Sequence, residues 1–271
     1  MLEQMYQRRT SFEPTWQLLS RYIVPYRGRF HERGGSMDGE RRDRYLIDPY
    51  PMDAAGKCAA GLQSGLTSPS RPWFELSLAD QEKAEYHPVR QWLDDVRDVM
   101  MAIYARGNTY AMLYDIEAEL CQFGTAAALM MQDYDTALWH RSYTCGEYAG
   151  GVDARGRLYS FGRRFELTAP QMVAEFGIDN VSVAVKTAYN NNDHTQRFEV
   201  EMLIVKNNEY KPELLKPGNF PWQSFYWERG NQQQFLRISG YKEQPFIMPR
   251  WTKVANCEYG YGPGHNALGN C

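Results

Sequence analysis

The sequence has little cysteine: five residues, odd in number and widely spread, with no C-x-x-C pair. This spacing argues against the common zinc modules, so the thiols are interpreted as free and no metal is expected. There is also no uninterrupted apolar run of the length that a membrane span needs. The N-terminal residues 1–9 lack the apolar core of a signal peptide, and we therefore expect synthesis in the cytoplasm and no membrane partner.

The chain has no surplus of positive charge. Its 271 residues include 30 Lys and Arg against 33 Asp and Glu, a formal net charge of -3. Proteins whose main task is to hold nucleic acid by its phosphates usually carry a basic surplus, so this balance argues against that class. The local exception is the Arg-, Gly- and Asp-rich segment 27–44, which is interpreted as a solvated loop. Phosphate contact is its alternative, with candidate residues Arg41, Arg42 and Arg44.

The sequence lacks the signatures of common enzymes. It contains no G-x-S-x-G, no H-E-x-x-H and no P-loop, because the glycines of residues 260–264 are not followed by Gly-Lys-Ser/Thr. The carboxylate pairs 94/95 and 117/119 are expected on solvated helix faces, and Asp133 and Asp135 are interpreted as part of a turn rather than a metal site. We therefore predict no enzymatic activity, no catalytic residue and no cofactor.

The sequence predicts that the first half of the chain is mainly helical. Pro49 opens a helix of unusually small residues that must end near Ser68, because Pro69 disfavours the α region in the residue before it. Apolar residues recur at helical spacing over residues 88–104. A further helix over 109–122 is expected to end at Gly124 and to run antiparallel to the preceding one across residues 107–108.

Short strands follow, and the sequence predicts an α+β fold. The expected strands cover residues 126–131, 137–143, 147–149, 158–164 and 198–205, with two helices between residues 168 and 189. Residues 222–227 and 235–238 flank Arg229-Gly230-Asn231, which is a hairpin signal.

The order of landmarks along the chain is more specific than any one of them. They are Tyr22-Ile23-Val24-Pro25, Arg41-Arg42, Leu62-Gln63-Ser64-Gly65-Leu66-Thr67-Ser68-Pro69, Arg71-Pro72-Trp73-Phe74, Phe123-Gly124-Thr125, Phe176-Gly177, Pro221-Trp222, Arg250-Trp251 and Glu258-Tyr259-Gly260. In this order they resemble the head-to-tail connecting (portal) proteins of short-tailed bacteriophages, along essentially the whole chain.

The resemblance implies a structural virion protein that is assembled in the host cytoplasm. Such proteins form a ring, usually of twelve subunits, at one capsid vertex, through which double-stranded DNA is packaged and ejected. The implied partners are the terminase large subunit, tail adaptor, and capsid or scaffolding proteins. By the same resemblance, residues 1–165 correspond to a wing, 166–195 to a helical stem region, 196–250 to a β-rich clip and 251–271 to the start of a returning stem helix. Trp222, Tyr226 and Trp227 would lie on the clip surface that faces motor and tail.

The sequence departs from the family pattern in two ways. A glycine-arginine-glycine-proline turn of the family is Gly260-Tyr261-Gly262-Pro263 here, so a basic residue is missing. Family members are also considerably longer, and most of the second stem segment, the tunnel loop and the crown have no counterpart in this chain. Two alternative hypotheses are therefore kept: a DNA-binding accessory protein that uses the basic arm 27–44, and a non-functional truncated prophage remnant.

Overall fold

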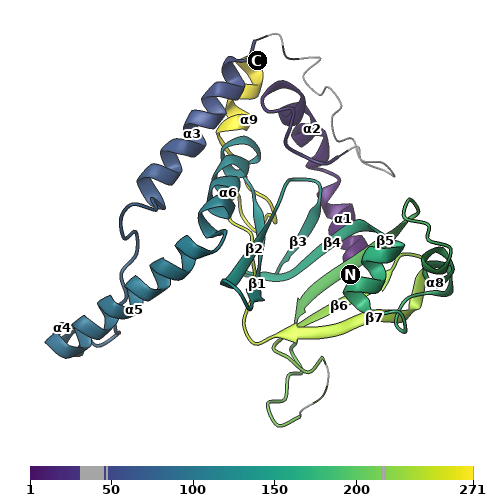
Figure 1. Cartoon of the computed structure of the whole chain (residues 1–271). Helices are drawn as coiled ribbons and strands as arrows, with labels where there is room; N and C mark the ends of the chain where they lie inside the picture. The colour runs from purple at the N-terminus through teal and green to yellow at the C-terminus, as the bar shows by residue number, and fades with distance from the viewer. Residues whose placement is uncertain (31–45, 47, 215, 217, 271) are drawn as a thin grey trace.

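The computed structural model describes residues 1–30, 46, 48–214, 216 and 218–270, which form helices and antiparallel sheets (Figure 1). The N-terminal part of these residues is helical, as the sequence predicts. Its helices are α1 (Leu2–Arg9), α2 (Glu13–Tyr22), α3 (Tyr50–Leu66), α4 (Gln81–Glu85), α5 (His87–Arg106) and α6 (Thr109–Phe123). None of the helices in the described ranges is both long enough and apolar enough to cross a bilayer.

Two antiparallel sheets follow α6. The smaller sheet has the strand order β2-β1-β8, and the larger has the order β3-β4-β5-β6-β7. The strands are β1 (Ala127–Asp133), β2 (Ala137–Tyr143), β3 (Tyr148–Val152), β4 (Leu158–Thr168), β5 (Arg197–Lys206), β6 (Trp222–Glu228), β7 (Asn231–Tyr241) and β8 (Phe246–Ile247). The α+β class is therefore confirmed.

The main core lies where the two sheets meet. Phe161 of β4 stacks on Phe246 of β8 with ring centroids 5.3 Å apart, and on Tyr148 of β3 at 5.9 Å. Along β6 buried and half-buried side chains alternate, as expected for a strand with one face toward the core. Helices α7 (Ala169–Phe176) and α8 (Val183–Asn190) cover the same inner face of the larger sheet, where Phe176 packs on Tyr226.

The C-terminal segment returns to the end of α6 and crosses it at glycine residues. Gly124 has a φ of +69°, and a Cβ there would collide with the backbone of Tyr261 and Gly262. The amide of Trp251 donates to the carbonyl of Gly124 at 2.9 Å. Tyr259 is fully buried beside Trp16 of α2, and its hydroxyl accepts from the amide of Gly150 in β3 at 3.3 Å. Residues 258–264, which include the start of α9 (Pro263–Ala267), thus connect α2, α6 and β3.

Several boundaries agree with the sequence-based predictions. Helix α3 ends at Leu66, Gly124 caps α6 in the left-handed region, and β6 and β7 form a hairpin around Arg229 and Gly230. The expected antiparallel pairing of the two helices around residue 107 is wrong. Figure 1 shows that α6 continues onward from α5 instead of folding back on it, because α6 packs on α3 and β2.

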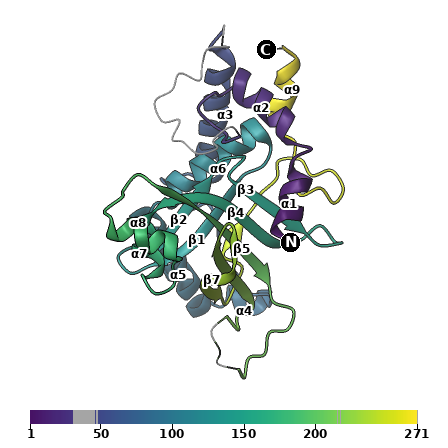
Figure 2. The same cartoon turned by 90° about the vertical axis from the view of Figure 1, so that its right-hand side faces the viewer.

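The division into wing, stem and clip stays a prediction. Residues of the expected wing and clip share one sheet, because β4 pairs with β5 from Ser160 to Thr168 (Figure 2). The expected stem segment 166–195 contains α7 and α8, two helices of 8 residues each that pack on this sheet.

We expect Gly124→Ala to lower the free energy of unfolding by about 3 kcal/mol or more, because the new methyl group combines a left-handed backbone with a collision against residues 261–262. The matched control is Gly61→Ala in α3, where a Cβ would meet nothing within 4 Å. This control should be neutral or more stable by about 0.5–1 kcal/mol, because alanine favours the helix. Urea unfolding followed by circular dichroism measures the unfolding free energy of both variants. Equal stability of Gly124→Ala and wild type would contradict the close contact between Gly124 and the backbone of residues 261–262.

Candidate functional site

The predicted aromatic trio is placed on both faces of strand β6. The side chains of Trp222 and Tyr226 point into the core, where they are 8% and 9% exposed, and Trp222 packs edge-on against Phe246. Trp227 points to the opposite face and is half-buried. Its indole Nε1 donates to Oε2 of Glu201 at 2.7 Å. Within this chain only Trp227 of the three is free to offer much of its ring to a partner, and the assignment to a motor- or tail-facing surface remains a prediction.

The predicted phosphate-contacting residues Arg41, Arg42 and Arg44 lie outside the described residues, so their role also stays a prediction. The start of the same basic segment is described, and it leads to a charged pocket that the sequence did not reveal.

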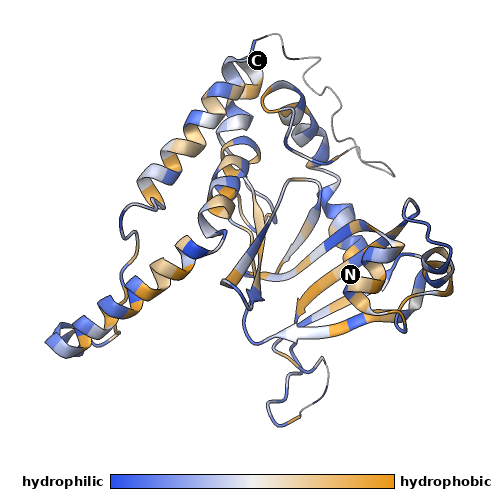
Figure 3. Ribbon diagram, in the orientation of Figure 1, coloured by the Kyte–Doolittle hydropathy of each residue, from blue (hydrophilic) through white to orange (hydrophobic). Residues whose placement is uncertain are grey.

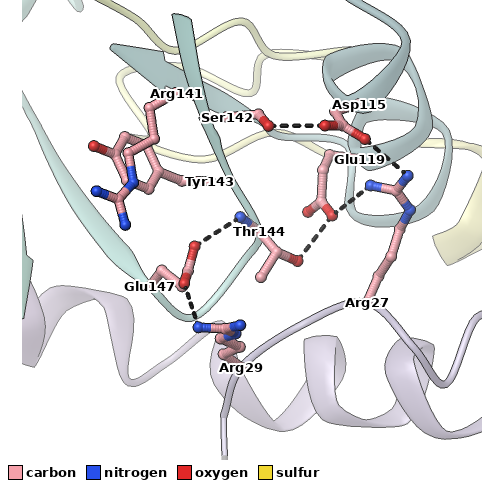
Figure 4. A pocket seen from close by; sticks show the side chains of 9 residues that line it. All are labelled: Arg27, Arg29, Asp115, Glu119, Arg141, Ser142, Tyr143, Thr144 and Glu147. Atoms are coloured by element: carbon pink, nitrogen blue, oxygen red, sulfur yellow. Dashed lines mark hydrogen bonds and ion pairs between the residues drawn. The ribbon is translucent and has the colours of Figure 1, made fainter. Parts of the chain in front are cut away.

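The charged pocket lies where the loop after α2 meets α6, β2 and the turn that follows β2. It has a volume of about 330 Å³ and is lined by Arg27, Arg29, Asp115, Glu119, Arg141, Ser142, Tyr143, Thr144 and Glu147. Figure 4 shows the side chains of this pocket converging from both sides of the cavity. Arg27 contacts Glu119 at 3.2 Å and Asp115 at 3.4 Å, while Arg29 pairs with Glu147 at 3.0 Å. Both arginines thus tie the loop after α2 to the body of the protein.

Glu119 is the central group of the charged pocket. Its Oε1 accepts from the Thr144 hydroxyl at 2.8 Å and its Oε2 from the amide of Cys145 at 3.0 Å, in addition to the Arg27 contact. Burial raises the pKa of Glu119 to about 7, and Arg27 together with these hydrogen bonds acts in the opposite direction. Near neutral pH this carboxyl therefore exists in both protonation states.

The expectation that Glu117 and Glu119 lie on a solvated helix face is wrong. Both are buried, and Glu117 accepts from the Thr67 hydroxyl at 2.8 Å at the end of α3. Burial also raises the pKa of Glu117. The sequence could have indicated part of this result. The side chains of residues two apart on a helix point in directions about 200° apart around the helix axis, so Glu117 and Glu119 could not share one narrow polar face. The remaining members of the charged pocket are too far apart in sequence for any spacing rule to connect them.

Two guanidinium groups flank the Tyr143 ring beside the charged pocket. Arg141 lies 5.8 Å and Arg163 4.9 Å from the ring centroid, and Arg163 also lies 4.3 Å from that of Phe165. Arg163 is 6% exposed, forms no ion pair with the described residues, and its Nε has no hydrogen-bond partner there. Desolvation accordingly lowers the pKa of Arg163, and the aromatic rings supply the compensating cation–π contacts.

The described residues contain no cluster of three or more His, Cys, Asp and Glu side chains that could hold a metal ion. The interpretation of residues 133–135 as a turn is confirmed, because Oδ2 of Asp133 accepts from the amide of Thr136 at 2.8 Å and from its hydroxyl at 2.7 Å. Among the described groups of the charged pocket, Arg27 and Arg29 are paired with carboxylates and fix a loop, and the pocket shows no nucleophile activated by a neighbouring base.

We expect Glu119→Gln to change how stability depends on pH. Between about pH 4.5 and 7 folded Glu119 holds a proton that the unfolded chain has lost, so this group makes the wild type less stable as pH rises through that window. The amide that replaces the carboxyl in this variant cannot ionise, and it removes that contribution. The stability of the variant relative to wild type should therefore rise by about 3 kcal/mol from pH 4.5 to 7.5. Urea titrations across this range measure it, and a pH-independent difference would contradict the raised pKa.

Comparisons with known proteins identify the family of the chain. Residues 1–271 match the model of the family described as "Bacteriophage head to tail connecting protein". The chain is 35% identical over 268 residues to a probable portal protein of Bordetella phage BPP-1, covering 98% of this chain and 48% of that protein. It is also 35% identical over 270 residues to the portal protein of Salmonella phage epsilon15, covering 99% of this chain and 48% of that protein.

The chain thus spans about half the length of the curated relatives that it matches. The order of aromatic, glycine and proline landmarks along the sequence, the α+β fold and the match over every residue agree with one another. The chain belongs to the bacteriophage head to tail connecting protein family.

Proposed function

We propose that this chain is a structural portal subunit, which forms part of a ring at one capsid vertex through which double-stranded DNA is packaged and ejected. The observation that carries the proposal is the family match along residues 1–271, together with two relatives that are named portal proteins. The absence of an activated nucleophile among the described residues fits a structural role. We propose no catalytic residue and no cofactor.

The charge of the chain supports a conduit more than a DNA-gripping protein. Its net charge is -3, and described arginines such as Arg27, Arg164 and Arg229 are already paired with carboxylates of the same chain. Because each neutralised phosphate strengthens binding, a strongly basic lining would retard the passage of DNA. The DNA-binding accessory protein and the truncated remnant are not favoured by the comparisons.

The partners are proposed from the family. They are further copies of the chain in a ring, with twelve as the expected number, the terminase large subunit, tail adaptor and capsid or scaffolding proteins. The proposed location is the virion, after assembly in the host cytoplasm.

Electron microscopy tests the ring directly. We expect rings with a central hole when this chain is joined to the part of the Bordetella phage relative that lies beyond the matched region, because the joined protein then has the length of a complete relative. The chain without that addition is the control. Persistent monomers of the joined protein, with a folded circular dichroism spectrum, would contradict the proposed function.

A DNA-binding measurement separates the proposed function from the accessory protein. We expect no measurable affinity for a short duplex at about 0.15 M salt, because the chain has a net charge of -3 and therefore no basic surplus with which to displace counterions. Fluorescence anisotropy should give the same result for wild type and for the variant in which Arg41, Arg42 and Arg44 are all alanine. Salt-sensitive binding that this triple substitution abolishes would instead support the DNA-binding accessory protein.

A further inference from the structure

Helix α3 lies alongside α6, and the two helices run antiparallel (Figure 1). The side-chain amide of Gln63 donates to the carbonyl of Tyr110 at 2.9 Å, and the Thr67 hydroxyl donates to Oε1 of Glu117 at 2.8 Å. Both hydrogen bonds start from the C-terminal part of α3 or from its cap. The N-terminal half of α3 is therefore held against α6 by other contacts.

Two cysteines meet in this other half of the helix pair. Cys58 of α3 is half-buried, Cys121 of α6 is 3% exposed, and both thiols are free. The two thiols lie within hydrogen-bond contact of each other. Cys58 belongs to the face of α3 that Ala55, Ala59 and Leu62 share at helical spacing, and Ala59 is fully buried there. The sulfur atoms are thus neighbours because two helix faces pack together, although they are far apart in the sequence.

Helix α3 has room for the small movement that a bond between these sulfurs requires. A disulfide places its sulfur atoms about 2 Å apart, so the two helices must approach slightly from thiol contact. The opposite surface of α3 carries Asp53 and Lys57, which pair with each other at 2.6 Å and have largely exposed side chains. On its flanks, a Cβ on Gly56 or Gly61 would meet nothing within 4 Å. Figure 3 shows weakly polar and hydrophobic residues recurring along both α3 and α6, as expected for helices that pack on each other.

We propose that Cys58 and Cys121 form a redox pair, whose oxidation to a disulfide fixes the N-terminal half of α3 to the end of α6. The inference goes beyond the portal function and does not depend on it. The surroundings of Cys145 are different, because its thiol contacts the carbonyl oxygen of Thr125 at 3.9 Å and the hydroxyl of Tyr148 at 4.0 Å.

The order of the two chemical steps follows from the exposure of the thiols. Cys58 is the more exposed, so its thiolate attacks a small disulfide such as oxidised glutathione, forms a mixed disulfide and releases one glutathione. Cys121 then loses its proton and attacks the Cys58 sulfur, which forms the internal disulfide and releases the second glutathione. Two electrons and two protons thus pass from the pair of thiols to the oxidant. Burial, the contact with Cys58 and the nearby Glu117 raise the pKa of Cys121, which makes it the poorer first nucleophile.

Peptide mapping tests which cysteines are joined. A background variant with Cys257→Ser and Cys271→Ser retains three of the five cysteines, namely Cys58, Cys121 and Cys145. With oxidised glutathione, we expect the Cys58–Cys121 cross-link to exceed any other pairing by about tenfold or more, because these two sulfurs are already in contact. Free thiols should fall from three to one as the cross-link forms, and dithiothreitol should restore them.

The matched controls compare two buried cysteines. In the background variant, Cys121→Ala should abolish the internal disulfide and leave Cys58 as a mixed disulfide, whereas Cys145→Ala should leave the cross-link unchanged. Circular dichroism establishes that each variant is folded, and the mapping of the background variant is decisive even if an alanine variant is not. A background variant that keeps both thiols, stops at the mixed disulfide or joins other cysteines overturns the proposal.

The redox state in the cell and the effect on stability are measured on the wild-type chain. Protein trapped with acid in the bacterial cytosol and alkylated in denaturant should carry both thiols reduced, because the cytosol reduces disulfides. The oxidised form should unfold about 5 °C or more above the reduced form, since the bond closes a loop of about 60 residues in the unfolded chain. A cross-link already complete in the cytosol, or an unfolding temperature that oxidation does not raise, overturns the proposal. None of these measurements requires a ring, so their failure would leave the proposed function intact.

Discussion

The fold depends on one close approach between two backbones, at the crossing of Gly124 with residues 260–264. A Cβ on Gly124 would collide with the backbone of Tyr261 and Gly262, and a Cβ on Gly260, Gly262 or Gly264 would collide with the backbone at the end of α6. Gly124 in addition has a left-handed backbone. Because residues 258–264 also insert Tyr259 against Trp16, the crossing places α2, the end of α6 and the C-terminal segment in one packed unit. Tyr259 also accepts a hydrogen bond from the amide of Gly150, so the same unit is joined to β3 of the larger sheet.

Much of the secondary structure could be predicted because it is encoded by local signals. Pro69 ends α3, Gly124 caps α6 and Gly230 turns β6 into β7, and each effect acts over a few residues. The direction of α6 relative to α5 could not be predicted in this way. Short helix connections favour antiparallel neighbours, but here α6 packs on α3 and β2, and these distant contacts decide its course.

The charged pocket shows the limit of prediction from spacing. Arg27, Glu119 and Thr144 come from three separate segments, and only the tertiary fold brings them together. A sequence position also does not reveal which face of a strand is covered. Trp222 and Trp227 belong to one aromatic cluster in the sequence, yet the first lies in the core and the second faces outward, since they lie an odd number of residues apart in a strand.

Two residues, Gly107 and Asn108, connect α5 to α6 and hold the base of a long projecting helix. Gly107 lies so close to the carbonyl of Leu138 that a Cβ would be only 2.9 Å from it, and Asn108 beyond it is fixed to the backbone of His140 by hydrogen bonds of 2.6 and 2.8 Å. Helix α5 has 20 residues and is therefore about 30 Å long. A rotation of about ten degrees at this pivot displaces the far end of the helix by about 5 Å, on the length that follows from the helical rise. A small backbone change beside β2 would therefore move the tip of α5 much farther than its base.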